Sequence, residues 1–427
     1  MIAIMFVTLL VMLIIGVPVS FSIGISALTY LFAAGFPPPL IMVQKMIDGV
    51  NSFPLLALPL FILSGEIMAY GCTPRLMRLA NLILGRVPGG LGAAGIAGCG
   101  FFGAISGSGV ATTAAIGGVV APEMVRKGYG KGYSAAVMAG AGTLGMVIPP
   151  SLPMVIFATS SSNISIGRMF MAGLIPGLMV VGLLIVLNTI LSIRRNYGAE
   201  RALYAKGEPL RIVIDALFPL LTPVIILGGV LSGVVTPTEA GVLAVVYAFL
   251  LSVFMYGEFK YKHLVQVATK TVVTSSIILF IMSSASPFGW LMATQNIPTR
   301  VAATLLSLDI SPLFIHFAIM LLLLFLGTFM ETNSIIILLT PMLLPVVMGL
   351  GQDPIHFGTI MMLNLAIGGA TPPLAVCLFT STRIVGIKVE ETFPDILYVV
   401  GFMVIGLILT LLFPGLALWM PTHLMPV

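Results

Sequence analysis

The amino-acid sequence predicts an all-α polytopic membrane protein. Of its 427 residues, 59% are hydrophobic and only 8% are charged, whereas soluble domains carry roughly 25% charged residues. The apolar residues form runs long enough for helices of about 20 residues, the length that crosses a bilayer. These runs are rich in leucine, isoleucine, valine and phenylalanine, a composition that excludes a disordered chain.

The expected membrane passes are apolar runs that end at proline, glycine or charged residues. They cover residues 2–17, 18–34, 53–70, 133–160, 169–192, 212–235, 239–255, 271–292, 357–382 and 393–415. The first run has no basic segment before it and no cleavage site of small residues, so we expect it to stay in the membrane. Segments 36–50 and 74–87 place apolar residues at helical spacing beside basic residues, and we expect them to lie in the membrane interface.

Two further apolar stretches, 89–121 and 311–349, are interrupted near the middle by polar residues. The interruptions are Ser106-Gly-Ser-Gly109 in the first stretch and Glu331-Thr-Asn-Ser334 in the second. We therefore expect each stretch to form a re-entrant helical hairpin, which enters and leaves the membrane on the same side and carries a polar tip. Irregular backbone at membrane depth is tolerated only where it is buried in protein or faces a cavity.

Lysine and arginine are divided unevenly between the two sides of this topology. If the linker 194–211 is cytoplasmic, all but three of the 19 basic residues face the cytoplasm, and the exceptions are Lys45, Arg168 and Arg300. The positive-inside rule therefore predicts this orientation, in which both termini face outward. Hairpin 89–121 then opens from the cytoplasm, and hairpin 311–349 opens from the opposite side.

The two halves of the chain resemble each other in order. Gly103 and Gly327, each ahead of a polar tip, lie 224 residues apart, and segments 145–150 and 368–373 lie 223 apart. Two weaker matches have a similar offset, Gly16-Val-Pro18 with Gly233–Pro237 and Thr73-Pro-Arg75 with Pro298-Thr-Arg300. Because the halves begin on opposite sides, the sequence predicts an inverted repeat of residues 1–193 and 212–427. Such repeats are common in secondary transporters, whose substrate and ion sites lie near mid-membrane.

Runs 133–160 and 357–382 are expected to be broken helices. Pro150 and Pro373 have no amide hydrogen, so the carbonyl four residues earlier loses its helical donor, and neighbouring glycines let the backbone unwind. A small hard cation satisfies such carbonyls together with hydroxyl and amide oxygens, and sodium suits this largely neutral set. We expect one sodium site per half. The candidate ligands are Ser106, Ser108 and carbonyls from Gly145 to Pro149 in the first half, and Asn333, Ser334, carbonyls from Gly369 to Thr371 and the Glu331 carboxylate in the second.

Substrate recognition is less visible in the sequence. Helix N-termini at the tips and after the breaks present free amide donors, which favour an anion. Hydroxyl groups beside the breaks are candidate substrate ligands, namely Thr159, Ser160, Thr380 and Ser381. Arg383 either pairs with a substrate carboxylate or anchors its helix at the cytoplasmic face. Glu66, an acid within a pass, is either the partner of a basic residue or part of a protein interface.

Three segments carry a resemblance to a known family. Phe102-Gly-Ala-Ile-Ser-Gly-Ser108, Gly145-Met-Val-Ile-Pro-Pro-Ser151 and Gly369-Ala-Thr-Pro-Pro373 resemble the large membrane subunit of the tripartite ATP-independent periplasmic (TRAP) transporters, and the resemblance covers nearly the whole chain. It implies a protein of the bacterial inner membrane with periplasmic termini. It also implies an elevator mechanism, in which the hairpins and broken helices move as a transport domain against a scaffold of outer helices.

The same resemblance implies partners and a substrate class. A periplasmic binding protein delivers an organic acid, sodium flowing inward drives uptake, and a small four-helix membrane subunit joins the scaffold. No segment for that subunit precedes Met1, so we expect it to be a separate polypeptide. The family handles C4-dicarboxylates, 2-oxo acids and sialic acid, and the overall character of the chain resembles the sialic-acid branch.

Other functions remain as alternatives. A stand-alone sodium- or proton-coupled carboxylate symporter needs no binding protein. A membrane-embedded enzyme requires a constellation such as HExxH, paired aspartates or a GxSxG elbow, which this sequence lacks. A channel is disfavoured because re-entrant gates of opposite orientation indicate alternating closure. We expect no organic cofactor, no nucleic-acid partner, and no disulfide or thiolate metal site among the three widely separated cysteines.

Overall fold

The protein is helical throughout the residues that its computed structural model describes, which are 2–35, 38–161, 164–198, 207–307, 311–373 and 375–425. Within them, six helical segments are long and apolar enough to cross a membrane, and a bent pair of helices raises the number to seven if it forms one span. The six are α11 (Ile166–Arg194), α12 (Glu208–Leu231), α13 with η4 (Pro237–Met255), α14 (Tyr261–Thr294), α17 (Thr332–Gly349) and α20 (Asp395–Leu412). The predicted all-α polytopic fold is confirmed.

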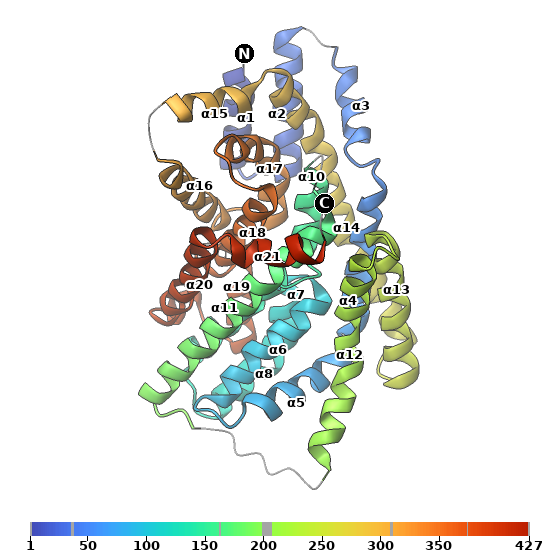
Figure 1. Ribbon diagram of the computed structural model, residues 1–427, viewed down its shortest axis with the longest axis vertical. Helices are drawn as coiled ribbons and strands as arrows, with labels where there is room; N and C mark the ends of the chain where they lie inside the picture. The colour runs from blue at the N-terminus through green and yellow to red at the C-terminus, as the bar shows by residue number, and fades with distance from the viewer. Residues whose placement is uncertain are drawn as a thin grey trace.

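Shorter apolar helices form the N-terminal part of the chain. Helices α1 (Ile2–Ile14) and α2 (Val19–Ala34) pack against each other at the upper end of the molecule (Figure 1). Helix α3 (Leu40–Asp48) precedes η1 (Phe53–Leu56) and α4 (Ala57–Met68), and the chain bends by 64° between them. Residues 40–48 and 53–68 therefore do not form one straight span.

Helix α14 corrects one predicted boundary, because it starts at Tyr261 and runs through the expected pass 271–292 to Thr294. The sequence interpretation ended the pass at Lys270, since a charged side chain is costly in lipid. In the structure the Lys270 ammonium lies 3.2 Å from the Glu66 carboxylate of α4, and the helix continues through it. Two roles were considered for Glu66, and the structure shows the first of them: Glu66 is the partner of a basic residue, Lys270.

Each half of the chain also contains two helices joined at a polar tip, followed by an interrupted helix. The first half has α5 (Cys72–Leu84), α6 (Gly90–Ser106), α7 (Gly109–Thr112), η2 (Thr113–Gly117), α8 (Gly118–Arg126), α9 (Lys131–Gly142), η3 (Thr143–Met146) and α10 (Leu152–Ser160). The second has α15 (Ile297–Ser307), α16 (Pro312–Gly327), α17, α18 (Pro354–Ala370), α19 (Val376–Val385), η5 (Val389–Thr392), α20 and α21 (Gly415–Leu424). Both interruptions contain a proline pair, the first at 147–151 and the second within the described residues 371–373.

Local chemistry explains where these helices end. Helix α6 stops at Ser106 because Gly107 adopts a left-handed conformation (φ 63°) and its amide closes the helix on the Gly103 carbonyl. Helix α7 is capped by the preceding Ser108, whose hydroxyl accepts a hydrogen bond from the Ala111 amide. Helix α17 is capped by the preceding Glu331, whose carboxylate accepts a hydrogen bond from the Ser334 amide. The polar residues that marked the tips in the sequence therefore cap the helices there.

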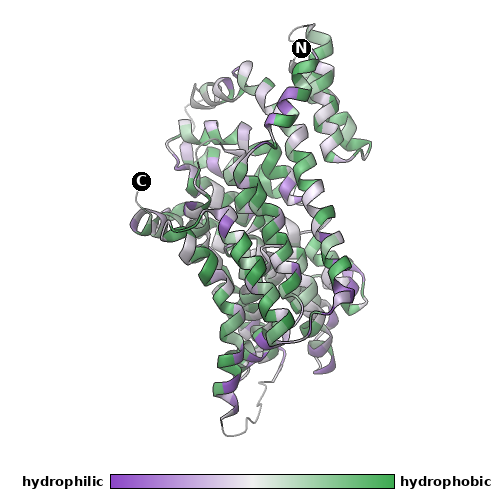
Figure 2. Ribbon diagram, turned by 90° about the vertical axis from the view of Figure 1, so that its right-hand side faces the viewer, coloured by the Kyte–Doolittle hydropathy of each residue, from purple (hydrophilic) through white to green (hydrophobic). Residues whose placement is uncertain are grey.

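Burial sorts the helices into an interior and a lipid-facing shell. Helices α9 and α18 are buried on nearly all sides, which explains why both are apolar around their circumference. Large apolar side chains such as Phe21, Val272 and Leu321 lie exposed on outer helices, as a surface against hydrocarbon requires. Figure 2 shows hydrophobic residues over most of the helices and hydrophilic segments mainly toward the lower end. The cysteines are free and buried: Cys72, Cys99 and Cys377.

Candidate functional site

Both polar tips and both helix interruptions meet at one cavity of about 270 Å³. Ser108 and Met146 line it from the first half, and Glu331, Asn333 and Gly369 line it from the second. Met146 and Glu331 are 185 residues apart in the chain, so their meeting is a product of packing. Within the described residues, no lysine, arginine or histidine lines this cavity.

Helix ends of both polarities surround the cavity. Helices α6 and α16 end beside it, so the last carbonyls of these helices point toward the tips. Helices α10, α17 and α19 begin beside it, at Leu152, Thr332 and Val376. The first amides of a helix have no partner within the helix, and each N-terminus carries about half a positive charge. The cavity therefore offers carbonyl oxygens for a cation and amide groups for an anion.

The first tip is held by a small network of hydroxyl groups. The Thr112 hydroxyl donates to the Ser108 carbonyl (2.8 Å), and the Ser106 hydroxyl lies 2.9 Å from Thr112 Oγ1. Ser106 and Thr112 are both buried. The sequence interpretation selected Ser106 and Ser108 but missed Thr112. Its spacing of four residues from Ser108 places the two on one helix face, which is the signal that could have identified it.

The interrupted helix of each half crosses the neighbouring tip at a glycine. A Cβ atom on Gly145 would lie 2.5 Å from Thr112 Oγ1 and 2.7 Å from the Ser108 carbonyl oxygen. In the second half, a Cβ atom on Gly368 would lie 2.7 Å from the carbonyl carbon of Gly327. Any larger residue would therefore force backbone apart at both crossings.

The second tip is organised by Glu331. One carboxylate oxygen accepts hydrogen bonds from the amide and hydroxyl of Ser334, at 3.0 and 3.3 Å, and the other accepts from Asn333 Nδ2 at 2.6 Å. Among the described residues, the buried amide oxygen of Asn333 has no hydrogen-bond partner. The Thr371 hydroxyl donates to the Ile367 carbonyl at 2.7 Å, which leaves its lone pairs available. At least one acceptor oxygen at this tip, that of Asn333, is therefore left for a ligand by the described residues.

The predicted substrate ligands lie elsewhere. Thr159 and Ser160 line a different cavity, of about 210 Å³, with Ser286 and Trp290 of α14. Thr380 donates to the Val376 carbonyl of its own helix, and Ser381 donates to the Ala135 carbonyl of α9. Arg383 is exposed. The structure thus gathers sodium candidates Ser108, Glu331, Asn333 and Gly369 around one cavity, which none of the predicted substrate ligands lines.

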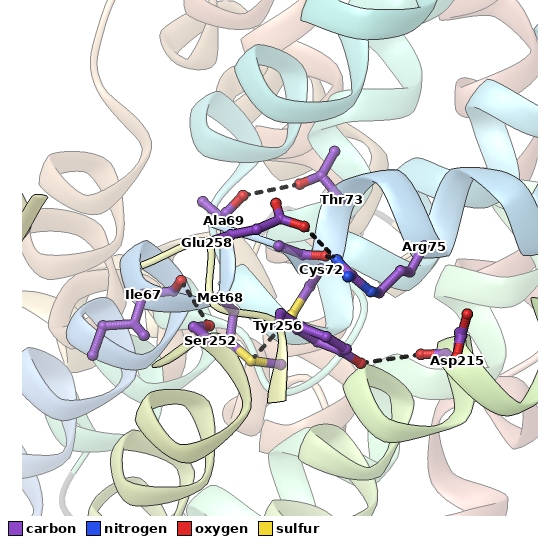
Figure 3. Close-up of polar contacts among 11 residues, drawn as sticks. Ile67, Met68, Ala69, Cys72, Thr73, Arg75, Asp215, Ser252, Tyr256 and Glu258 are labelled. Atoms are coloured by element: carbon purple, nitrogen blue, oxygen red, sulfur yellow. Dashed lines mark hydrogen bonds and ion pairs between the residues drawn. The ribbon is translucent and has the colours of Figure 1, made fainter. Parts of the chain in front are cut away.

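A separate cluster fixes the start of α5, the helix that leads into the first hairpin (Figure 3). The Arg75 guanidinium donates to the Gly71 carbonyl and to the Glu258 carboxylate (2.8 Å), and it lies 3.6 Å from the centre of the Tyr256 ring. Burial raises the pKa of the Tyr256 hydroxyl, which stays protonated and donates to the Asp215 carbonyl at 3.1 Å. These contacts tie α5 to α12 and to the end of η4.

Arg75→Gln is expected to lower the free energy of unfolding by about 1–2 kcal/mol. The substitution removes a cation–π contact and a half-exposed ion pair, each of which contributes up to about 1 kcal/mol. Thermal unfolding in detergent measures the change, and Arg78→Gln, at an exposed arginine of the same helix, is the control. Equal unfolding temperatures for Arg75→Gln and Arg78→Gln would show that the cluster does not hold α5.

Comparison with known proteins places this geometry in context. The family described as "Tripartite ATP-independent periplasmic transporter, DctM component" matches residues 6–416. The isethionate TRAP transporter permease protein of Oleidesulfovibrio alaskensis is 39% identical over 95% of this chain, and the chain spans 64% of that relative's length. The C4-dicarboxylate TRAP large permease of Rhodobacter capsulatus is 34% identical, with 94% of this chain and 95% of the relative covered. The sialic acid TRAP large permease of Vibrio cholerae is 34% identical, with 95% of each covered.

Solved structures share the fold at low sequence identity. The YdaH transporter of Alcanivorax borkumensis has a TM-score of 0.58 at 14% identity, and covers 91% of this chain and 89% of its own. MtrF of Neisseria gonorrhoeae has a TM-score of 0.59 at 14% identity, and covers 87% and 82%. At this identity the likeness concerns the fold alone.

Proposed function

The chain belongs to the TRAP transporter family as its DctM component, the large permease, and from this premise we propose that it imports an organic acid anion driven by sodium. The observation that carries the proposal is the meeting of two polar tips and two interrupted helices at one cavity. The named relatives are transporter permeases, and the prediction that the chain is not an enzyme is confirmed by them.

Two sodium sites follow from the acceptor groups beside the cavity. The first would use Ser106, the Ser108 segment and carbonyls from Gly145 to Pro149, and Thr112 joins this set because its hydroxyl bonds both serines. The second would use Glu331, Asn333, Ser334 and the 369–371 segment, where the unpartnered Asn333 oxygen calls for a cation or a hydrogen-bond donor. Hard cations prefer such oxygen ligands.

The anion would lie at the N-terminus of α19, where Val376 and Cys377 line the cavity. The N-terminus of α10 is less suited, because the Leu152 amide donates to the Gly107 carbonyl and Pro153 has no amide hydrogen. The N-terminus of α17 is less suited, because the Glu331 carboxylate already occupies it. Since no basic side chain of the described residues lines the cavity, backbone dipoles supply the positive potential for the substrate.

An inverted repeat and alternating access are part of the proposal. The crossings of Gly103 with Gly145 and of Gly327 with Gly368 repeat at the offsets found in the sequence, which supports halves of 1–193 and 212–427. Residues 199–206 of the proposed linker 194–211 lie outside the described residues.

In an elevator cycle, the two hairpins and broken helices would move together past α4, α13 and α14.

Orientation and partners complete the proposal. The ends of α11 and α12 that carry Arg194, Arg195 and Arg211 lie at the lower end of Figure 1, and α3 and α15, with Lys45 and Arg300, lie toward the upper end. This division supports an inner-membrane protein with periplasmic termini. A small four-helix membrane subunit, as a separate chain, and a periplasmic binding protein would be its partners, since the family is described as tripartite.

Uptake into proteoliposomes tests the function. The permease with its small subunit is reconstituted with and without a candidate binding protein, under an inward sodium gradient or with choline in place of sodium. The panel contains isethionate, a C4-dicarboxylate and sialic acid, which is the substrate that the sequence resemblance favours. Uptake that needs both sodium and the binding protein supports the proposal. Sodium-dependent uptake by the chain alone would instead identify the stand-alone symporter, and uptake indifferent to sodium would contradict ion coupling.

Asn333→Ala combined with Thr371→Val is expected to raise the half-saturating sodium concentration about tenfold, the factor that corresponds to about 1.4 kcal/mol. The two substitutions remove the side-chain oxygens of Asn333 and Thr371, which are uncharged sodium ligands in the proposed second site. Uptake as a function of sodium concentration measures the shift. The control is Thr189→Val on α11, which removes a hydroxyl with the same bond to the carbonyl four residues back. A wild-type sodium titration for the double variant would remove the second site.

A further inference from the structure

A second cavity, of about 260 Å³, lies between the hairpin of α16 and α17 and the corner formed by α14 and α15. Every described residue that lines it is apolar, and six of them are Met292, Ile297, Val301, Ile319, Leu322 and Leu343. A buried water needs two to four polar partners, and this lining provides none. Water is therefore a poor occupant of the cavity.

The cavity opens where the protein meets the membrane. Val301 of α15 and Leu322 of α16 are both 44% exposed at its rim. The helix α16 around this rim also exposes Phe314 and Leu321, so the surface at the opening suits contact with lipid. A hydrocarbon chain is the occupant that both the lining and the surroundings favour.

Helix α15 also presents a positive charge beside the opening. Ile297 and Val301, four residues apart, face the cavity from one side of the helix. Arg300 is three residues after Ile297, so it flanks the same face, and its side chain is exposed. Among the described residues no ion pair is formed by Arg300. A guanidinium in this position is suited to a phosphate oxygen, which it can bind through two parallel hydrogen bonds.

We propose that this corner binds an anionic phospholipid of the surrounding bilayer, with one acyl chain in the apolar cavity and its phosphate on Arg300. The amphipathic helix α15 lies toward the upper end of the molecule in Figure 1, the end to which the proposed orientation assigns the outer headgroups. The bound lipid joins α14 to the second hairpin. Its effect on uptake, in contrast to its binding, rests on the proposed function, in which that hairpin moves past α14.

Lipid retention tests the site in the complete, delipidated permease. Phosphatidylglycerol and phosphatidylethanolamine are added separately in detergent, and bound lipid is counted by native mass spectrometry. Ala318→Trp, which fills the cavity from α16, is expected to lose the bound lipid. Arg300→Gln is expected to bind phosphatidylglycerol about fivefold more weakly, the factor for one charge near a membrane surface, with phosphatidylethanolamine less affected.

Controls separate binding from folding. Ala303→Trp adds the same ring to an exposed position of α15 and is expected to retain lipid as the wild type does. Val301→Trp fills the cavity from the other wall and replaces Ala318→Trp if that variant does not elute as a single species. Wild-type lipid retention by the folded cavity-filling variant overturns the acyl-chain site. An unchanged preference for phosphatidylglycerol in Arg300→Gln overturns the headgroup contact, and both results are read without measuring uptake.

Discussion

Gly368→Ala is expected to abolish uptake and to lower the free energy of unfolding by about 1–3 kcal/mol, the range for overpacking a close contact. The added Cβ would lie 2.7 Å from the carbonyl carbon of Gly327, so α18 and α16 must separate at the second tip. That separation moves Gly369 and the 371–373 segment relative to Glu331, and both sides of the proposed sodium site shift. Thermal unfolding and sodium-driven uptake in proteoliposomes measure the two effects.

The control for this substitution is Gly401→Ala in the middle of α20. A Cβ atom there meets no atom of the described residues within 4 Å, so alanine adds helix propensity without a clash and should leave uptake intact. Gly145→Ala is the counterpart in the first half, where the Cβ atom would meet the Ser108 carbonyl oxygen at 2.7 Å. Normal uptake by both Gly368→Ala and Gly145→Ala would show that the crossings tolerate movement and are not part of the ion sites.

Ser106→Leu is expected to abolish sodium-driven uptake while the protein remains inserted in the membrane. Ser106 is buried at the first tip, where its hydroxyl lies 2.9 Å from Thr112 Oγ1. Leucine removes that oxygen, fills the space in which a cation would sit and leaves the tip with one ligand fewer. Uptake measured under a sodium gradient, together with membrane localisation of the variant, tests the expectation.

A binding measurement separates loss of the sodium site from loss of movement. Sodium that binds only the folded protein raises its unfolding temperature, so the wild type should unfold at a higher temperature in sodium chloride than in choline chloride. Ser106→Leu should reduce this sodium-dependent difference, whereas Ser232→Leu, at an exposed serine after α12, should retain it. Unchanged uptake in Ser106→Leu would remove the first site from the proposed mechanism.

The polar interruptions selected from the sequence, at 106–109 and 331–334, coincide with helix ends for a local reason. Glycine at position 107 allows a left-handed turn, and Ser108 and Glu331 cap the helices that follow. Proline pairs interrupt both buried helices because they lack amide donors. These effects act within a few residues of the chain, so a single sequence reveals them without knowledge of the packing.

The side chains that face the cavity were harder to predict. Thr112 was missed because its role depends on the approach of Gly145 from another helix. Ser381 was selected for its distance from the break, yet its hydroxyl donates to Ala135 of α9, a contact that depends on how α19 packs against α9. The predicted pass stopped at Lys270 because an unpaired lysine is costly in lipid. In the structure the Glu66 carboxylate of α4 compensates that charge, and this partner could not be predicted from the residues around Lys270.

The amino-acid sequence by itself determined that this chain crosses a membrane as helices and where those helices are interrupted, because hydropathy and backbone hydrogen bonding are properties of short segments. Only the tertiary structure decided that Met146 and Glu331, from opposite halves, line one cavity, and that Thr159 and Ser160 line another. Such meetings depend on packing between helices far apart in the chain, which no local pattern encodes.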